Sequence, residues 1–184
     1  MSLPVRALVL DRDGTLIEHV PYLADPAGVR VLPGVPEALA AAKAAGIALF
    51  LHTNQSGVGR GMYDLAAVHA CNDRMLHLLG LSDDLFTRIC IAPEAPDKLA
   101  IYRKPSPRFA RELMEAFGYQ PTELCYIGDR GADLATAQAA GTRAAGVATG
   151  LDDLAAEVRE LGLDDYPLFS SFQEAITHVL TEWR

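Results

Sequence analysis

The sequence has little of several kinds of residue, and each shortage excludes a class of protein. Its three cysteines include no C-x-x-C pair and leave at least one thiol unpaired, which argues against a disulfide-stabilised secreted domain. No apolar run approaches the ~20 residues of a membrane helix, and the N-terminus lacks a signal-peptide pattern. Lysine and arginine (16) are outnumbered by aspartate and glutamate (24), so the net charge is −8. We therefore expect a soluble cytoplasmic protein with no nucleic-acid or membrane partner.

Short apolar runs alternate along the chain with helical patterns. Half of the 184 residues are hydrophobic, enough for one buried core, so we expect a single domain over residues 1–184. Strands are predicted over residues 5–10, 47–51, 88–92, 124–127 and 144–148. Helices are predicted over residues 35–46, 64–80, 106–118, 133–141 and 171–180. Continuously apolar strands that alternate with helices predict an α/β fold, a Rossmann-like, three-layer, doubly wound and mostly parallel sheet.

Residues that favour helix ends mark two of these helices. Ser106 is predicted to cap the helix over 106–118, with Pro107 as its first residue and Gly118 as its stop signal. Ser171 and Glu174 form a capping-box pattern at the start of the last helix. In a sheet of this kind, ligands bind beyond the carboxyl ends of the strands, so the residues that follow each apolar run matter most.

Acidic residues follow two of the predicted strands. Asp11 and Asp13 lie in the stretch DRDGT, which is also compatible with an ordinary turn but lacks the Gly and Glu spacing of an EF-hand calcium loop. Asp129 follows the fourth strand in GDRGAD, and Asp133 comes four residues later, where a helix N-terminus also favours an acid. Acids gathered at one sheet edge repel each other. A hard cation with oxygen ligands, such as Mg²⁺, is their natural neutraliser.

Two further stretches carry groups that could bind an anion. HTNQSGVGRG, after the second strand, is rich in glycine and offers the hydroxyl and amide side chains of Thr53, Asn54, Gln55 and Ser56. Such a loop can cradle phosphate oxygens, although a plain polar loop would look the same and the P-loop spacing is missing. YRKPSP places Arg103 and Lys104 before a helix, where the helix dipole disfavours cations. Either an anionic ligand or solvent could stabilise this pair.

Taken together, DRDGT, TNQSG, RKP and GDRGAD resemble, in this order, the four motifs of the haloacid dehalogenase superfamily of phosphohydrolases. The resemblance covers most of the chain. It implies that Asp11 attacks phosphorus to form an aspartyl-phosphate, and that Asp13 protonates the leaving oxygen and then activates water. It also implies Mg²⁺ held by Asp11, Asp129 and the main-chain carbonyl of Asp13. Thr53 and Lys104 would hold the phosphoryl oxygens.

Within the superfamily, the motifs are most similar to a small subgroup without a large cap domain. This subgroup includes D-glycero-D-manno-heptose 1,7-bisphosphate 7-phosphatase and histidinol phosphatase. The resemblance implies substrate contacts from the loop after the first motif, from the second motif and from the residue before the motif lysine. The candidate substrate-binding residues are His19, Tyr22, Asn54, Gln55, Ser56, Arg60 and Arg103. Arg130 and Asp133 are expected to support the metal or Lys104.

One stretch departs from this subgroup, many members of which carry a structural zinc loop, C-x-H followed by C-x-C, before RKP. Here Cys90 remains, but Ala92, Ala100 and Tyr102 occupy the other ligand positions. Because structural zinc takes four ligands, we expect Mg²⁺ as the cofactor and no structural Zn²⁺. The 92–102 loop must then be ordered by packing or remain mobile. The five histidines show no metal spacing, and most are expected on the surface or on helix faces.

These observations predict a monomeric, Mg²⁺-dependent phosphomonoester hydrolase for a small phosphorylated metabolite, such as a heptose bisphosphate or histidinol phosphate. A polynucleotide 3′-phosphatase is an alternative, because TNQSG and RKP resemble that class too, but the acidic charge counts against it. A receiver-like phosphoacceptor, which is not an enzyme, is the second alternative. Receivers lack an acid two residues after the phosphorylated aspartate, so Asp13 favours turnover.

Overall fold

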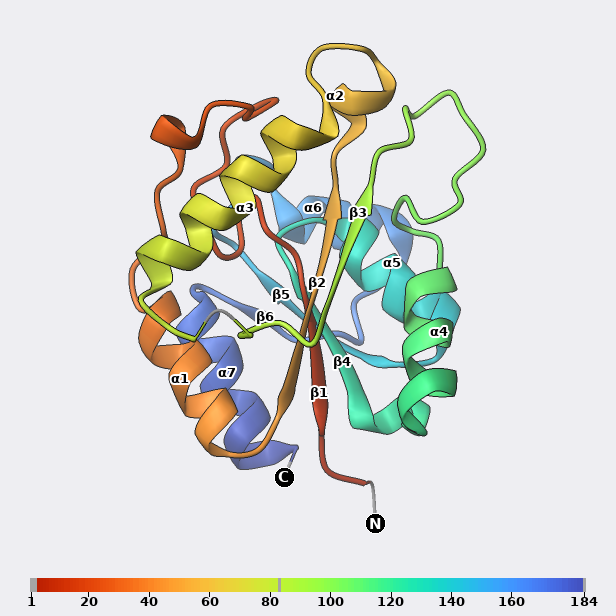
Figure 1. Cartoon of the computed structure of the whole chain (residues 1–184). Helices are drawn as coiled ribbons and strands as arrows, with labels where there is room; N and C mark the ends of the chain where they lie inside the picture. The colour runs from red at the N-terminus through yellow and green to blue at the C-terminus, as the bar shows by residue number, and fades with distance from the viewer. Residues whose placement is uncertain (1–2, 83, 184) are drawn as a thin grey trace.

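A central sheet of parallel strands runs through the computed structural model, which describes residues 3–82 and 84–183 (Figure 1). Its strand order is β3-β2-β1-β4-β5-β6, so the chain starts in the middle of the sheet and crosses outward to both edges. This is the predicted doubly wound topology. The strands are β1 (Ala7–Leu10), β2 (Ala48–Asn54), β3 (Arg88–Ala92), β4 (Leu124–Gly128), β5 (Arg143–Val147) and β6 (Leu168–Phe169).

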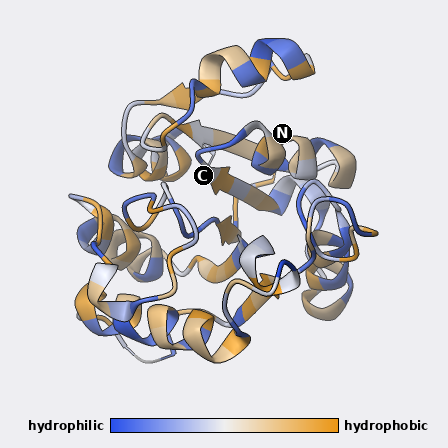
Figure 2. Cartoon of the chain, turned by 90° about the horizontal axis from the view of Figure 1, so that it is seen from above, coloured by the Kyte–Doolittle hydropathy of each residue, from blue (hydrophilic) through white to orange (hydrophobic). Residues whose placement is uncertain are grey.

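In the described part of the chain, three helices cover each face of the sheet. One hydrophobic cluster joins the sheet to α1 (Val35–Ala44), α3 (Leu65–Leu79) and α7 (Phe172–Glu182). A second cluster, on the other face, joins it to α4 (Arg108–Phe117), α5 (Gly131–Ala140) and α6 (Leu154–Leu161). Figure 2, seen from above, shows hydrophobic and hydrophilic residues along the same helices, as expected where one side of a helix is buried. The short elements are α2 (Ser56–Gly59), η1 (Pro26–Gly28) and η2 (Pro121–Glu123).

Strand β1 is apolar at every position because both of its faces are covered. Leu8 and Leu10 belong to one cluster, whereas Ala7 and Val9 belong to the other, and all four are fully buried. Leu10 aligns with Leu51 of β2 and with Ile127 of β4. The residues that follow these three strands therefore meet at one edge of the sheet.

The predicted end of α4 at Gly118 is confirmed, but the predicted Ser106 cap is wrong, because Pro107 takes the cap position. Gly118 and Gly141 end α4 and α5 in the left-handed conformation, at φ 69° and 74°, which glycine adopts without strain. The predicted start of α4 was one residue early, since Pro107 occupies the cap position and the helix begins at Arg108.

The capping box at α7 is only half formed. The Ser171 hydroxyl accepts a hydrogen bond from the Glu174 amide, as predicted, at 3.2 Å. The Glu174 carboxylate instead accepts from the amide and hydroxyl of Ser170. The sequence patterns also missed α6 and β6, which lie in the more polar final part of the chain.

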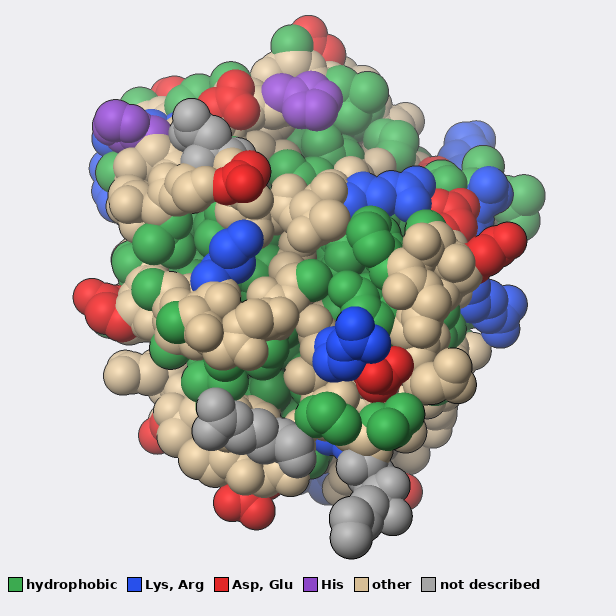
Figure 3. All heavy atoms as spheres, turned by 60° about the horizontal axis from the view of Figure 1, so that its bottom comes forward, with side chains coloured by type: hydrophobic (Ala, Val, Ile, Leu, Met, Phe, Trp, Pro, Cys, Tyr) green, Lys and Arg blue, Asp and Glu red, His purple; other side chains and the backbone are tan. Residues whose placement is uncertain are grey.

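The face at the amino ends of the strands carries charges of both signs. Figure 3 shows acidic and basic side chains interspersed there among hydrophobic ones. This mixture differs from the basic patch that is typical of a nucleic-acid-binding surface. Among the described residues, no helix combines the length and the apolar character that crossing a membrane requires.

The packing predicts a large cost for shortening a side chain in β1. Leu10→Ala is expected to lower the free energy of unfolding by about 2–5 kcal/mol, because it opens a cavity in a fully buried cluster. Leu99, 84% exposed, provides the matched control, and Leu99→Ala should change that free energy by no more than about 0.5 kcal/mol. Urea denaturation measures both. Similar losses in the two variants would contradict the assignment of β1 to the core.

Candidate active site

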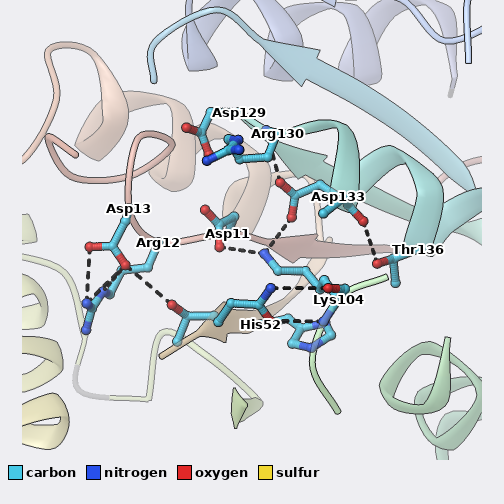
Figure 4. Close-up of polar contacts among 12 residues, drawn as sticks. Asp11, Arg12, Asp13, His52, Lys104, Asp129, Arg130, Asp133 and Thr136 are labelled. Carbon is cyan, nitrogen blue, oxygen red and sulfur yellow. Dashed lines mark hydrogen bonds and ion pairs between the residues drawn. The ribbon is translucent and has the colours of Figure 1, made fainter. Parts of the chain in front are cut away.

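Three acidic side chains meet at the carboxyl edge of the sheet (Figure 4). Asp11 follows β1, Asp129 follows β4, and Asp133 lies in the first turn of α5. The Asp11 amide donates to the Ile127 carbonyl at 3.0 Å, which joins the ends of β1 and β4. One oxygen from each carboxylate lies within 4.8 Å of the others, and all three residues are buried. Carboxylates this close in a buried site require a counter-charge.

Lys104 supplies part of that charge. Its Nζ donates to Asp11 Oδ1 at 2.6 Å and to Asp133 Oδ1 at 2.5 Å. Burial alone would lower the pKa of Lys104, but attraction to Asp11 and Asp133 outweighs burial and raises the pKa. Lys104 is therefore an ammonium ion at neutral pH. Burial also raises the pKa of Asp11, an effect that the positive charge of Lys104 opposes.

Asp129 is left without such a partner. Among the described residues, neither of its carboxylate oxygens has a hydrogen-bond donor, although both are buried. Burial, followed by repulsion from Asp11 and Asp133, raises the pKa of Asp129 to about 9. The His19 ring lies beside it, with Nδ1 at 3.8 Å from Asp129 Oδ2. An unsatisfied carboxylate next to two others fits a hard cation with oxygen ligands such as Mg²⁺, which would restore the ionised form.

Two glycines leave the space that the Asp129 carboxylate occupies. A Cβ atom added to either Gly14 or Gly150 would collide with that carboxylate. Gly14 also has φ +84°, a conformation that other residues rarely adopt. The Thr149 hydroxyl donates to the Gly14 carbonyl at 2.5 Å, so the loop after β5 is fastened to the DRDGT loop. Asp129 therefore depends on a close approach between these two loops.

The Asp13 side chain is held outside the acidic cluster. The Arg12 guanidinium donates to both of its oxygens, from Nε at 3.0 Å and from Nη2 at 3.1 Å, and Gln55 Nε2 donates at 3.0 Å. Arg12 is fully buried, and its Nη1 donates to Asn72 Oδ1 of α3 at 2.9 Å. Tyr63 donates in turn to Gln55 Oε1 at 3.1 Å. The Asp13 side chain is thus held in one orientation.

A cavity of about 370 Å³ opens over these residues. Asp11, Asp13, Lys104, Arg130 and Asp133 line it. Six of the seven candidate substrate-binding residues line it as well: His19, Tyr22, Asn54, Gln55, Ser56 and Arg103. The topology therefore brings residues from distant parts of the chain to one pocket, as expected at the carboxyl edge of such a sheet.

Three of the predicted site residues lie around this cavity rather than in its lining. Thr53 is fully buried, and its hydroxyl accepts a hydrogen bond from Gln55 Nε2 at 2.8 Å. Asp129 lies buried beside Asp11. Arg60 is exposed, with its guanidinium 5.8 Å from the centre of the Tyr22 ring.

The two amide side chains proposed to bind substrate already have protein partners. Asn54 bonds to the backbone of Lys104, accepting from its amide at 2.9 Å and donating to its carbonyl at 3.3 Å. Gln55 contacts Asp13, Thr53 and Tyr63. These contacts favour a positioning role for both amides.

Sequence reasoning missed four residues of the site, namely Arg12, His52, Tyr63 and Asn72. Most of the histidines lie at least partly exposed, as expected, and His52 is the exception, because it lies in β2 and is fully buried. Its place inside the apolar run, directly before the Thr53 motif, was the available signal. The 92–102 loop is held without cysteine ligands, since Glu94 Oε1 accepts from the amides of Ile101 and Tyr102.

Comparison with known proteins agrees with this geometry. Residues 22–141 match the family model described as haloacid dehalogenase-like hydrolase. The chain is 33% identical over 144 residues to D-glycero-beta-D-manno-heptose-1,7-bisphosphate 7-phosphatase of Pseudomonas aeruginosa, covering 78% of this chain and 81% of that protein. It is 31% identical over 174 residues to the Pseudomonas putida protein of the same name, covering 85% and 99%.

A solved structure is similar over nearly the whole chain. It is the D,D-heptose 1,7-bisphosphate phosphatase of B. bronchiseptica, complexed with magnesium and phosphate. The TM-score is 0.86 at 27% sequence identity, and the match covers 97% of this chain and 99% of that one.

Because Gly150 leaves space for the Asp129 carboxylate, we predict that Gly150→Ala weakens Mg²⁺ binding. The added methyl group would displace the Asp129 carboxylate, and we expect a loss of affinity of roughly 10–100-fold. Isothermal titration with MgCl₂ measures it. Leu151→Ala, at the exposed neighbouring position, is the control and should bind Mg²⁺ like the wild type. Unchanged affinity in a folded Gly150→Ala protein would show that Asp129 does not bind the cation.

Proposed function

The chain belongs to the haloacid dehalogenase-like hydrolase family, and from this membership we propose that it is a Mg²⁺-dependent phosphomonoester hydrolase acting on a heptose bisphosphate. The observation that carries the proposal is the position of Asp11. Its carboxylate faces the cavity at the end of β1, with Lys104 at 2.6 Å and Asp129 and Asp133 beside it. This grouping of one carboxylate, one ammonium group and two further acids at one edge of the sheet supports roles as nucleophile, phosphate-binding cation and metal ligands.

The reaction proceeds in two displacements. An Asp11 oxygen forms a bond to phosphorus while the bond from phosphorus to the leaving oxygen breaks, and Asp13 gives that oxygen its proton. Water then attacks the phosphorus of the aspartyl-phosphate, and Asp13 takes a proton from this water. The bond from phosphorus to the Asp11 oxygen breaks, which releases inorganic phosphate and restores the Asp11 carboxylate. Arg12 and Gln55 hold Asp13 at the cavity wall for both transfers.

The remaining groups bind the charge of the phosphate. Lys104 and Thr53 would hold the phosphoryl oxygens as charge redistributes between them. Mg²⁺ held by Asp11, Asp129 and the Asp13 carbonyl would offset the repulsion between the nucleophilic carboxylate and the phosphate. Asp133 keeps Lys104 charged and in place.

The heptose bisphosphate is supported by the names of the relatives and by the charge of the pocket. The similar proteins from two Pseudomonas species carry that activity in their names, which favours this substrate over histidinol phosphate. Arg103 lines the cavity in addition to Lys104, which suits a substrate with two phosphates. Arg130 also lines it, but its guanidinium pairs with Asp152 at 2.8 Å and Glu157 at 2.9 Å rather than with the acidic cluster. A volume of about 370 Å³ accommodates a sugar of this size.

The direct test is release of inorganic phosphate from heptose 1,7-bisphosphate, histidinol phosphate and an aryl phosphate, with and without EDTA. We expect multiple turnovers that require Mg²⁺, with the heptose bisphosphate cleaved fastest. Stoichiometric labelling without turnover would support a phosphoacceptor instead. Faster cleavage of histidinol phosphate would overturn the substrate assignment.

Replacement of the nucleophile should abolish turnover. Asp11→Asn is expected to lower kcat by at least ~10³-fold, because an amide is a poor nucleophile and a poor metal ligand. Steady-state phosphate release measures this loss. Asp165→Asn makes the same chemical change at an exposed acid and should leave kcat unchanged. Near-normal turnover in Asp11→Asn would reject Asp11 as the nucleophile.

Asp13→Asn separates proton transfer from metal binding. Its kcat is expected to fall by roughly 10²–10⁴-fold, because the amide can neither donate nor accept the transferred proton. Its Mg²⁺ affinity should stay close to that of the wild type in calorimetry, since the proposed metal contact is the main-chain carbonyl. A collapse of Mg²⁺ affinity would mean that the Asp13 side chain binds the ion directly.

A further inference from the structure

The segment that leads into Lys104 is held by side chains of β2, and we propose that His52 is a positioning residue that places Lys104 through the Tyr102 carbonyl. This inference rests on the proposed phosphatase function, in which Lys104 holds phosphoryl oxygens. His52 is not part of the cavity lining and touches neither Asp11 nor Asp133 through a hydrogen bond. Any effect on catalysis must therefore pass through the backbone that it holds.

Two side chains of β2 bind this segment at alternate positions. Residues 52 and 54 point to the same face of the strand, because side chains in a strand alternate. The Nε2 atom of His52 lies 2.8 Å from the Tyr102 carbonyl, and Asn54 bonds to both the amide and the carbonyl of Lys104. Figure 4 shows His52 next to Lys104 at this end of the sheet. The side chains of His52 and Asn54 thus attach the backbone of residues 102 and 104 to strand β2.

The partners of His52 determine its tautomer. A carbonyl can only accept, so Nε2 carries the hydrogen and donates to Tyr102. Nδ1 is then the acceptor for the Tyr126 hydroxyl, 3.3 Å away. Burial, followed by the charge of Lys104, lowers the pKa of His52 to about 3, so the ring stays neutral. It can donate to the segment without adding a second positive charge beside Lys104.

Packing fixes the ring as well as its hydrogen bonds. The His52 ring meets Phe109 of α4 edge to face, with ring centres 5.1 Å apart, and Tyr126 of β4 at 6.0 Å. The other side of the segment is tied to Glu94, which accepts from the Tyr102 amide at 2.7 Å. Tyr102 is therefore fixed through both its amide and its carbonyl, two residues before Lys104.

Holding Tyr102 in place matters because the Lys104 ammonium group must keep a well-defined position between Asp11 and Asp133. Its Nζ lies 2.6 Å from Asp11 and 2.5 Å from Asp133, in a position buried by the surrounding residues. A backbone shift at Tyr102 would move the ammonium group relative to the phosphoryl oxygens. A displacement of about 1 Å in a catalytic constellation can cost on the order of 10²-fold in rate.

Substitutions at His52 test this role. His52→Phe keeps the ring and removes both hydrogen bonds, whereas His52→Gln keeps an N–H donor at about the distance of Nε2. His178→Phe is the control, because His178 packs against Phe169 and Trp183 away from the site. For each protein we would measure kcat and KM with p-nitrophenyl phosphate, inhibition by inorganic phosphate, Mg²⁺ affinity and Tm.

We expect His52→Phe to lower kcat by roughly 10–100-fold and to weaken phosphate inhibition, with Mg²⁺ affinity unchanged. His52→Gln should recover most of the loss, and His178→Phe should match the wild type. A folded His52→Phe protein with normal kcat and phosphate inhibition, and only a lower Tm, would overturn the proposal. So would a loss that His52→Gln does not recover.

Two further comparisons keep the test decisive. If His52→Phe does not fold, His52→Gln is compared with His52→Asn, whose shorter amide cannot reach the Tyr102 carbonyl. The proposal predicts a higher kcat for Gln, and equal values would contradict it. If the wild type itself releases no phosphate, the proposed function fails. If the wild type turns over and His52→Phe equals it, only the role of His52 fails.

Discussion

The salt bridge that Lys104 makes with Asp11 and Asp133 is the interaction on which the rest of the site depends. Three buried carboxylates at one sheet edge are unstable without positive charge, and Lys104 provides one unit of it inside the protein. The described residues give the Asp129 carboxylate no hydrogen-bond donor, so the cluster keeps the capacity to bind a cation. The proposed Mg²⁺-dependent mechanism requires this partial neutralisation, because complete neutralisation by the protein would leave no site for the cation.

Each side chain of the proposed site has its own support from a different part of the chain. Lys104 is held through its backbone by β2, Asp13 is held by the buried Arg12, and Asp129 fits a space left by two glycines. The three supports are of different kinds: hydrogen bonds to the backbone for Lys104, an ion pair for Asp13, and space left by glycines for Asp129. The geometry of the pocket therefore rests on several elements that the sheet brings to one edge.

The sheet and the position of its acidic residues could be predicted from the sequence. The buried polar pairs of the site could not, and one physical reason explains why. The apolar runs predict the parallel sheet, and their carboxyl ends predict where Asp11 and Asp129 meet. What the sequence does not reveal is which polar side chains pair inside the protein. Arg12 is buried against Asn72, 60 positions away, and His52 bonds to Tyr102, 50 positions away. Such pairs leave no local pattern, because they form only when the sheet assembles.

The central claim is that Asp11 carries the phosphoryl group during turnover. Rapid acid quenching of the reaction with heptose 1,7-bisphosphate, followed by peptide mass spectrometry, measures this directly. The account predicts a phosphoryl group on the peptide that contains Asp11, formed with Mg²⁺ and absent after EDTA treatment. Phosphorylation of a different residue, or turnover through which the enzyme never becomes phosphorylated, would contradict it.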